Sequence, residues 1–433
     1  MIRSRRVKQM FLLWIIVIFS WLLYRESLSF YFISDDFYFL SFNSIPLILK
    51  TFYTDQHFIP VFLIYIYLIK SIFSLNPFIF HLSAVLIHLI NVILVYILGK
   101  ELLQKKKSAL LAAFIFANFF SHYEVIFWIS GLSLSLMVLF YLSALIFLLK
   151  FLKSERQLFL WGYLGAALLA FLSHEYALTL FIFPFLLKHK RAIKSAIAFI
   201  LIVLGSLMIR HFLGNISAPQ PFRPINFLKG EVLSHLQLFL PLPQVLEKIP
   251  DVGIIILFIL IIYLLLRNFR RQHFFLVLWL ESTILLFSAT SLPQARYYYL
   301  SSIPAIYLLV DILKKEGRIF LFIILISNLA FLGRQSQLWR QSGLITEKIV
   351  RQISRELKAL LPDKKLYVIS LPDSLNGPPW HAYLFRNGLK EAVELIGKTD
   401  ADRLMLADPA AKIPDKNNLI LKYENGSLVR NPL

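Results

Sequence analysis

Two adjacent carboxylates, Asp35 and Asp36, stand in the aromatic stretch F-Y-F-I-S-D-D-F-Y-F-L at residues 30–40. The stretch follows a strongly apolar segment, and aromatic side chains are favoured where a membrane meets water. A charged side chain is costly inside a bilayer, so acids beside a membrane segment indicate a functional role. We predict that the pair lies at a membrane lip, where one carboxylate takes a proton from a hydroxyl as a general base. The alternative is a solvated acid pair that only ends a helix.

Three further groups of polar residues are predicted to face the same side of the membrane as the aspartates. One of them contains Arg296, and a guanidinium matches the oxygens of a phosphate leaving group. The residues predicted to bind a phosphate are Arg296, Arg210, Arg223 and Tyr297. Histidine and glutamate can orient either reactant, and aromatic side chains offer platforms for sugar rings. The residues predicted to orient substrate are His57, His122, Glu124, Trp128, His174 and Glu175.

Each of these residues also has a purely structural interpretation. Histidine and glutamate at helix ends can cap the helix or complement its dipole, and Arg296 can anchor a helix at the membrane interface. His81, His88 and Asn91 share one helix face, a pattern typical of polar packing between membrane helices. A divalent cation beside the acids is a further alternative, although nothing in the sequence has the ligand spacing of a zinc site.

The composition indicates a membrane protein. The 433 residues are 58% hydrophobic and 16% charged, which is far more apolar than a soluble domain of this length requires. The net charge of +20 comes from short basic clusters between apolar runs, so it follows the orientation rule for membrane loops and does not indicate nucleic acid. There is no cysteine, which excludes disulfides, thiolate metal sites and a cysteine nucleophile.

The basic clusters predict the topology, because Lys and Arg favour the cytoplasmic side of a membrane. The N-terminus, M-I-R-S-R-R-V-K, is therefore cytoplasmic, and the aspartates lie outside. About eleven spans are predicted, at residues 9–24, 77–98, 108–120, 132–149, 158–172, 177–187, 195–212, 252–266, 274–289, 300–313 and 319–332. Several fall short of the roughly 20 residues of an ideal span, which favours tilted helices around an outward cavity. Residues 57–73 are predicted to lie flat on the outer face, and residues 214–251 to form a proline-rich outer loop.

The chain becomes polar after residue 333, and this change predicts two domains. Residues 1–333 form the membrane domain, and residues 334–433 form a small α/β domain outside the membrane. Within the second domain we expect a helix at residues 338–361 and strands at residues 366–371 and 418–423. The domain has about the usual size of an independent unit.

Four motifs in order resemble those of GT-C membrane glycosyltransferases, and the nearest likeness is to the protein O-mannosyltransferase-like group. N-P-F-I-F-H-L-S-A-V-L-I-H-L-I-N-V-I-L-V-Y-I-L at residues 76–98 resembles the second-span signature. H-Y-E-V-I-F-W-I-S-G at residues 122–131 is similar to the group's His/Glu/Trp loop, and F-L-S-H-E-Y-A-L-T-L at residues 171–180 is similar to its Ser-Lys-Glu helix start. A-R-Y-Y-Y-L-S-S-I at residues 295–303 is similar to its Glu-Arg-Tyr-x-Tyr-Leu-Pro-Ser stretch. Each motif is weak alone, but the four occur in the expected order, and the likeness covers roughly residues 35–313.

The resemblance implies a sugar donor carried on a polyprenyl phosphate and an acidic general base in the first outer loop. Asp35 and Asp36 stand at that place, and Asp35 is slightly favoured. Two departures leave the sugar and the acceptor open. His174 stands where the group has Lys, and N-F-F at residues 118–120 replaces its His-Pro.

These observations predict an all-α polytopic protein of GT-C type with a small α/β domain, located in a bacterial cytoplasmic membrane. The expected activity moves a sugar from a polyprenyl phosphate to a hydroxyl of a protein, lipid or glycan on the outer face, with inversion. One alternative is a flippase or transporter of lipid-linked glycans, which would place acids deep within spans. Another is an O-antigen-type polymerase or ligase, which would place its catalytic centre in a large late outer loop.

Overall fold

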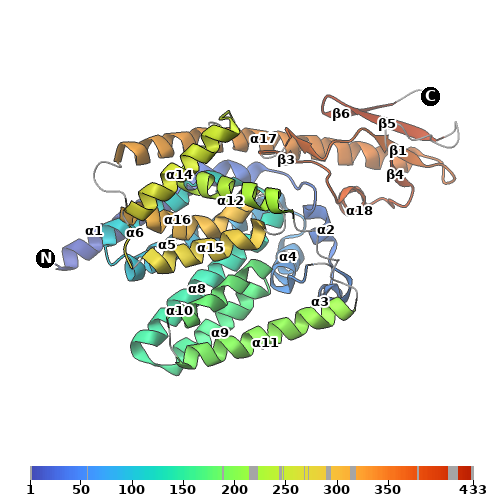
Figure 1. Cartoon of the computed structure of the whole chain (residues 1–433). Helices are drawn as coiled ribbons and strands as arrows, with labels where there is room; N and C mark the ends of the chain where they lie inside the picture. The colour runs from blue at the N-terminus through green and yellow to red at the C-terminus, as the bar shows by residue number, and fades with distance from the viewer. Residues whose placement is uncertain are drawn as a thin grey trace.

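The computed structural model describes residues 2–55, 57–187, 190–213, 223–242, 246, 248–267, 269–271, 273–288, 294–312, 318–377, 380–407 and 418–430. Within them the chain forms a helical bundle that carries a small sheet at one end (Figure 1). The bundle helices are α1 (Ile2–Tyr24), α5 (Pro77–Leu102), α6 (Lys106–Ala117), α7 (Tyr123–Phe127), α8 (Leu132–Ser154), α9 (Gln157–Phe171), α10 (Ile182–Leu186), α11 (Lys190–Phe212), α12 (Pro224–Phe239), α14 (Asp251–Arg267), α15 (His273–Ser288), α16 (Tyr298–Ile312) and α17 (Arg318–Ala359). Short 3₁₀ turns join several of them: η1 (Arg25–Ser29), η2 (Phe120–His122), η3 (Ile129–Gly131), η4 (Glu175–Phe181) and η5 (Ala295–Tyr297).

Several helices are long and apolar enough to cross a membrane, so this is an integral membrane protein. Among the described residues they are Val7–Ser29, Pro77–Leu102, Ile129–Ser154, Lys190–Phe212 and Leu321–Ala359. A sixth is a bent pair, Lys106–Ala117 with Phe120–Phe127, whose two parts differ in direction by 47°. The count of about eleven therefore depends on shorter apolar helices: Gln157–Phe171, Glu175–Leu186, Asp251–Leu264 and His273–Ser288. The span predicted at residues 300–313 falls on α16, which holds Pro304 in its interior.

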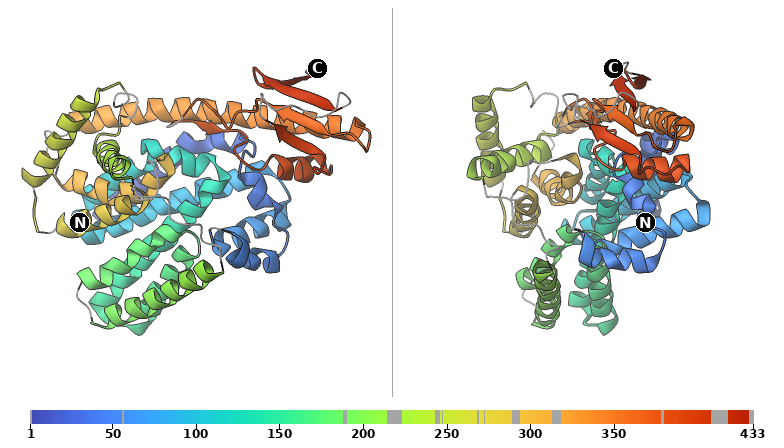
Figure 2. Two further views of the ribbon diagram at one scale, coloured as in Figure 1. Left: turned by 45° about the vertical axis from the view of Figure 1, so that its right-hand side comes forward. Right: turned by 90° about the vertical axis from the view of Figure 1, so that its right-hand side faces the viewer.

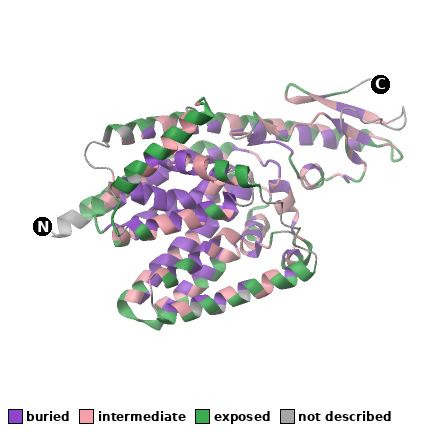
Figure 3. Cartoon of the chain, viewed as in Figure 1, coloured by how far each residue is buried: buried purple, intermediate pink, exposed green. Residues whose placement is uncertain are grey.

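Apolar side chains occupy both the packed interior of the bundle and its outer surface. Buried residues fill the centre of the bundle, and exposed residues follow the outward faces of α11 and α14 (Figure 3). These outward faces are themselves apolar, with exposed side chains that include Leu201, Met208, Ile256 and Ile259. An apolar outer face on helices with satisfied backbone groups is what a bilayer requires.

Three short helices gather at the end of the bundle nearest the sheet (Figure 1). They are α2 (Asp36–Ser41), α3 (Ile45–Thr54) and α4 (Pro60–Phe73). Proline occupies the first turn of α3 and α4, where its missing N–H leaves no bond unmade. The Lys70 ammonium of α4 donates to the carbonyl oxygens of Leu40 and Phe42 at the end of α2. The segment predicted to lie flat on the outer face, residues 57–73, is occupied by α4 from Pro60 onward, and its flat placement stays a prediction.

The proline-rich outer loop predicted at residues 214–251 is a helix over part of its length. Residues 214–222 lie outside the described residues, but α12 occupies residues 224–239 and packs against α14, α15 and α16. Pro224 starts this helix at its first turn. The prediction of a loop was wrong here because prolines mark breaks without excluding a helix between them.

The polar C-terminal region begins inside a helix. The single helix α17 runs from Arg318 to Ala359, along one side of the bundle and on to the sheet (Figure 2), so the boundary expected at residue 333 falls within it. A four-stranded sheet follows in the order β4-β1-β5-β6, from β1 (Leu366–Ile369), β4 (Leu404–Ala407), β5 (Leu419–Glu424) and β6 (Ser427–Arg430). The strands predicted at residues 366–371 and 418–423 are confirmed as β1 and β5, which pair in parallel. A two-stranded ribbon, β2 (Ser374–Leu375) with β3 (Ala382–Tyr383), and the helix α18 (Leu389–Gly397) complete the region.

Candidate active site

A cavity of about 480 Å³ lies where α2, α8, η4 and η5 meet near the C-terminal region. We call it the Asp35 cavity. Its lining combines polar groups with an apolar wall: Asp35, Phe39, His57, Ile59, Trp128, Ser130, Gly131, Ser133, Leu134, His174, Glu175, Tyr176, Leu178, Leu286, Arg296 and Tyr297. Seven of the residues predicted from the sequence are therefore brought together, although they come from segments far apart in the chain. They are Asp35, His57, Trp128, His174, Glu175, Arg296 and Tyr297.

The two aspartates occupy different environments. Asp36 starts helix α2 and is buried, and its carboxylate accepts hydrogen bonds from the Ile33 amide (3.1 Å) and from the amide and hydroxyl of Ser130 (2.8 and 2.7 Å). Burial raises the pKa of Asp36 to about 7. Its two oxygens are thus used to join α2 to the start of α8, and it does not line the cavity.

Asp35 faces the cavity. It precedes α2 as the N-cap residue, but its side chain makes no capping bond to that helix. Its Oδ1 accepts instead a 2.6 Å hydrogen bond from the Nδ2 of Asn387, a residue of the C-terminal region. Ser34, just before it, has a φ of 47°, and this left-handed backbone turns the chain sharply at the aspartates.

The close approach of the Asn387 segment to Asp35 requires a glycine. Gly388 has a φ of +82°, and a Cβ there would clash with the backbone carbonyl oxygen of Ser34. The Ser34 amide also donates to the Leu384 carbonyl oxygen at 2.9 Å. The C-terminal region is therefore fastened to the chain on both sides of Asp35.

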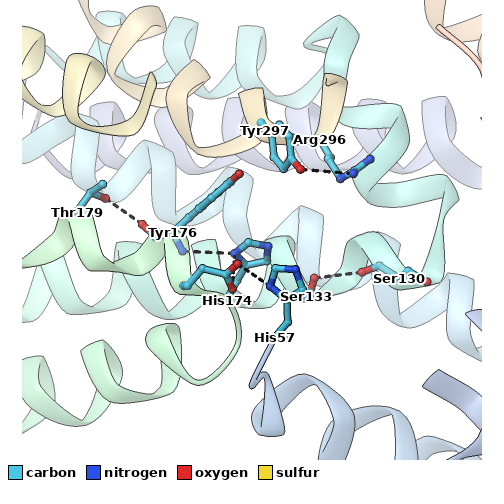
Figure 4. A network of polar contacts seen from close by, with 9 residues as sticks. His57, Ser130, Ser133, His174, Tyr176, Thr179, Arg296 and Tyr297 are labelled. Atoms are coloured by element: carbon cyan, nitrogen blue, oxygen red, sulfur yellow. Dashed lines mark hydrogen bonds and ion pairs between the residues drawn. The ribbon is translucent and has the colours of Figure 1, made fainter. Parts of the chain in front are cut away.

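Arg296 is held by several partners at once. Its backbone amide donates to Glu124 Oε2 at 2.9 Å, and its Nη1 donates to Glu124 Oε1 and, at 2.9 Å, to the Tyr383 hydroxyl. The guanidinium carbon lies 5.3 Å from the Trp128 ring centre and 4.9 Å from that of Tyr297. Its Nη2 makes one long contact of 3.5 Å, with the Tyr297 hydroxyl (Figure 4). Among the described lining residues, Arg296 is the one with a permanent positive charge.

The Glu175 carboxylate contacts two imidazoles, those of His57 and His174, and Figure 4 shows both imidazoles below Arg296. His57 Nδ1 is 2.8 Å from Glu175 Oε1, and this bond raises the pKa of His57 above its ordinary value. His174 Nδ1 accepts the Tyr176 amide at 3.3 Å, so this nitrogen carries no proton. The 3.5 Å contact of His174 with Glu175 is therefore not an ion pair, and burial lowers the pKa of His174. His57 is consequently the imidazole that pairs with Glu175, and the pair is ionic when His57 is protonated.

The remaining predicted residues lie outside the lining. His122 is buried against Phe116 and Tyr299, with its Nε2 3.1 Å from the Ser302 hydroxyl. Glu124 is buried behind Arg296 and orients it. Two arginines predicted to bind phosphate also do not line the cavity. Arg210 donates to the Asp55 carbonyl oxygen and stacks on Phe52 and Phe58, and Arg223 is exposed before α12.

The sequence reasoning missed five contributors. Ser130 lies in η3, Ser133 lies in the first turn of α8, and Tyr176 follows the His174–Glu175 pair. Tyr383 and Asn387 come from the C-terminal region and hold Arg296 and Asp35. The one local signal was the Asn387-Gly388 pair, which marks a tight turn but does not indicate what the turn contacts.

Gly131 lets the turn before α8 pack directly against the backbone of α7. A Cβ at Gly131 would lie 2.7 Å from the Glu124 carbonyl oxygen and 2.9 Å from the Val125 Cα. Real side chains do not tolerate such distances, so glycine is required where α7 turns into α8. The described residues contain one group of three His, Asp or Glu side chains that could hold a metal ion, and it does not line this cavity.

The comparisons with known proteins concern the fold. No protein-family model matches the chain, and no similar curated protein is found. Among solved structures, ArnT from Cupriavidus metallidurans in the apo state is similar with a TM-score of 0.53 and 12% identity, over 94% of this chain and 92% of that one. The structure of ArnT bound to undecaprenyl phosphate gives a TM-score of 0.46 at 12% identity, over 93% and 86% of the two chains. The likeness to the apo structure is one of fold: this chain shares the overall fold of ArnT over most of its length.

Proposed function

We propose that this protein transfers a sugar from a polyprenyl-phosphate donor to an acceptor hydroxyl on the outer face of the membrane. The observation that carries the proposal is the Asp35 cavity, where the Asp35 carboxylate and a fixed arginine line one space at the end of an apolar bundle. A glycosyl transfer needs a base for the acceptor and a cation for the leaving phosphate. The donor's polyprenyl chain would lie along the apolar helices, beside wall residues such as Leu134 and Leu286.

In the proposed reaction, Asp35 takes the proton of the acceptor hydroxyl. The oxygen forms a bond to the anomeric carbon as the bond from that carbon to the phosphate oxygen breaks. The electron pair leaves with the polyprenyl phosphate, and direct displacement inverts the anomeric centre. We assign the role of base to Asp35 rather than Asp36, because donors from Ile33 and Ser130 bond to both oxygens of Asp36.

Arg296 would meet the charge that develops on the leaving phosphate. Its partners Glu124 and Tyr383 fix the guanidinium before the reaction, and fixed charge acts without reorganisation at the moment of transfer. The protonated His57, held by Glu175 on the other side of the cavity, would supply a second positive charge toward the donor. Trp128 and Tyr297 offer aromatic faces for the sugar ring.

The test is transfer by the purified full-length chain in lipid nanodiscs. A panel of undecaprenyl-phosphate sugars with a radiolabelled sugar is incubated with delipidated cell-envelope extract as the source of acceptor. We expect release of undecaprenyl phosphate together with label in the extract, for one donor of the panel. Movement of donor across vesicle membranes without any cleavage would contradict the proposal and support a flippase.

A further inference from the structure

A second polar group lies inside the bundle, between α12 and α15. Glu231 and His235 are one turn apart on α12, and Glu281 is midway along the apolar helix α15. One ligand atom from each residue lies within 4.8 Å of the other two. None of the three lines the Asp35 cavity. Acidic side chains on an apolar helix are costly and call for a compensating charge.

The bonds of His235 determine which nitrogen carries a proton. Its Nδ1 is 2.9 Å from the backbone carbonyl oxygen of Glu231, and a carbonyl oxygen can only accept, so Nδ1 carries a proton. Its Nε2 lies 2.9 Å from Glu281 Oε1. A neutral imidazole would then direct a lone pair at a carboxylate, which is repulsive. Either a second proton or a cation must stand at Nε2.

His273, on the same helix as Glu281, shows the contrasting arrangement. Its Nδ1 accepts the Arg270 amide at 3.1 Å, so the single proton of the neutral ring stands on Nε2. That nitrogen donates to Asp311 Oδ2 at 2.9 Å. This pair is satisfied without any added cation. The two histidines therefore contact carboxylates at the same distance but with opposite tautomers.

The balance of charge and the orientation of the imidazole favour a metal ion at His235. Two carboxylates outweigh one imidazolium, whereas a divalent cation balances them. The Glu231 carboxylate lies beside the hydroxyl of Ser288, two turns beyond Glu281 on α15, so Ser288 offers a further oxygen at the same place. A histidine that donates its far nitrogen to a backbone carbonyl is also oriented as metal-binding histidines are.

We propose that Glu231, His235 and Glu281 bind a divalent transition-metal ion, with His235 Nε2 and one oxygen of each glutamate as ligands. One nitrogen with carboxylate oxygens suits Zn²⁺ or Mn²⁺. The ion would join α12 to α15. Because Ser234 on α12 is also 3.5 Å from the Tyr298 hydroxyl, it would brace the segment that carries Arg296. The proposed role is structural and independent of the sugar transfer.

The experiment measures metal in the purified full-length chain. The protein is stripped with a chelator, reloaded with Zn²⁺ or Mn²⁺, desalted and analysed by inductively coupled plasma mass spectrometry. We expect about one ion per chain in the wild type and loss of that ion in His235→Gln and Glu281→Gln, as for a three-ligand site. The melting temperature should rise on reloading in the wild type but not in Glu281→Gln. Co²⁺ loading should add a visible absorption band.

His273→Gln is the matched control, because it removes a buried imidazole–carboxylate pair whose tautomer needs no cation. It should retain the metal. If the His235 variant does not fold, Glu231→Gln replaces it, and we expect this variant to lose the metal ion as well. A wild-type chain that holds no Zn²⁺, Mn²⁺ or Co²⁺ would overturn the proposal and identify His235 as an imidazolium. Equal metal content in the wild type and the glutamine variants of the three ligands would overturn it as well.

Discussion

Two cavities at different levels of the same bundle share helix α8 as a wall. Leu134 lines the Asp35 cavity and Leu149 lines the other, which places them roughly 22 Å apart along the helix. The second, which we call the Arg271 cavity, is larger at about 660 Å³. Its lining is mainly Leu and Phe, with Arg271, His273 and Asp311 as its charged or titratable groups.

The difference lies in how the polar groups are used. In the Arg271 cavity, His273 and Asp311 bond to each other at 2.9 Å, and Lys105 lies 3.4 Å from the same carboxylate. In the Asp35 cavity, a carboxylate, an arginine and an ion-paired histidine face one space from separate elements. A site depends on such converging groups more than on its volume. The smaller cavity is therefore the better candidate for chemistry.

The largest expected effect concerns the two aspartates. Asp35→Asn keeps the shape of the side chain and removes its basicity, so transfer should fall by roughly 10³-fold while donor binding remains. Asp36→Asn should cost far less in rate, because its oxygens bond to protein groups. Single-turnover transfer with radiolabelled donor measures both rates. An equal loss of rate in the two variants would contradict the assignment of Asp35 alone as the base.

The control for Asp36 is thermal stability against pH. The pKa of Asp36 is raised to about 7 in the folded protein, so folding keeps the proton that an unfolded Asp releases near its ordinary value of 3.8. The free energy of unfolding should therefore fall as pH rises between about 4 and 7. Asp36→Asn should flatten this part of the profile, whereas Asp35→Asn should leave it in place.

The next largest effect compares the two arginines. Arg296→Ala should lower transfer roughly 100-fold, because it removes fixed charge at the leaving phosphate. Arg296→Lys should retain part of the activity, since it keeps the positive charge but loses the planar guanidinium that can donate two hydrogen bonds to a phosphate. Arg271→Ala, in the larger cavity, should change the rate by less than about twofold. A large loss in Arg271→Ala with none in Arg296→Ala would reverse the assignment of the site.

A smaller effect is expected from the C-terminal region. Asn387→Ala removes the 2.6 Å hydrogen bond to Asp35 and should lower the turnover number roughly tenfold, with little change in donor KM. The matched control is Lys390→Ala, an exposed change on α18 in the same region. Equal activity of both variants would show that Asn387 does not position the base.

The smallest effect is a shift with pH. Glu175 raises the pKa of His57, so His57 stays protonated to higher pH than its ordinary value of 6.5 allows. The stabilisation of this pair is fully present below that ordinary value and is lost as pH rises through the raised pKa. Glu175→Gln should therefore move the falling limb of kcat/KM to lower pH, with a loss of roughly threefold at pH 7. If the falling limb of kcat/KM stays at the same pH in Glu175→Gln, His57 takes no part in the transfer step.

Much of the membrane architecture could be predicted from the sequence. Apolar runs and basic clusters are strong signals, and the first strand of the C-terminal sheet also has a clear apolar pattern. The acid pair in its aromatic stretch indicated Asp35, and the motifs indicated Arg296 and the His174–Glu175 pair; these residues do line one cavity. Such signals are local, and each depends on residues that are neighbours in the chain.

What could not be predicted depends on contacts between distant segments. His122 and His174 look alike in sequence, yet packing against Tyr299 buries the first while the second lines the cavity. The roles of Tyr383 and Asn387 follow from the docking of a segment more than 250 positions away from Glu124 and Asp35, as their separations of 259 and 352 residues show. Helix α12 was missed because its flanking prolines dominate the local pattern.

The central claim, that the Asp35 cavity receives the phosphate end of a polyprenyl donor, can be tested by photolabelling. A polyprenyl phosphate with a photoreactive group near the phosphate is crosslinked to the chain in nanodiscs, and the labelled peptides are mapped by mass spectrometry. We predict label beside Leu134, Leu178 or Leu286, competed away by unlabelled polyprenyl phosphate, weakened in Arg296→Ala and unchanged in Arg271→Ala. Label confined to residues 269–276 of the Arg271 cavity, or label that excess lipid phosphate does not compete, would contradict the claim.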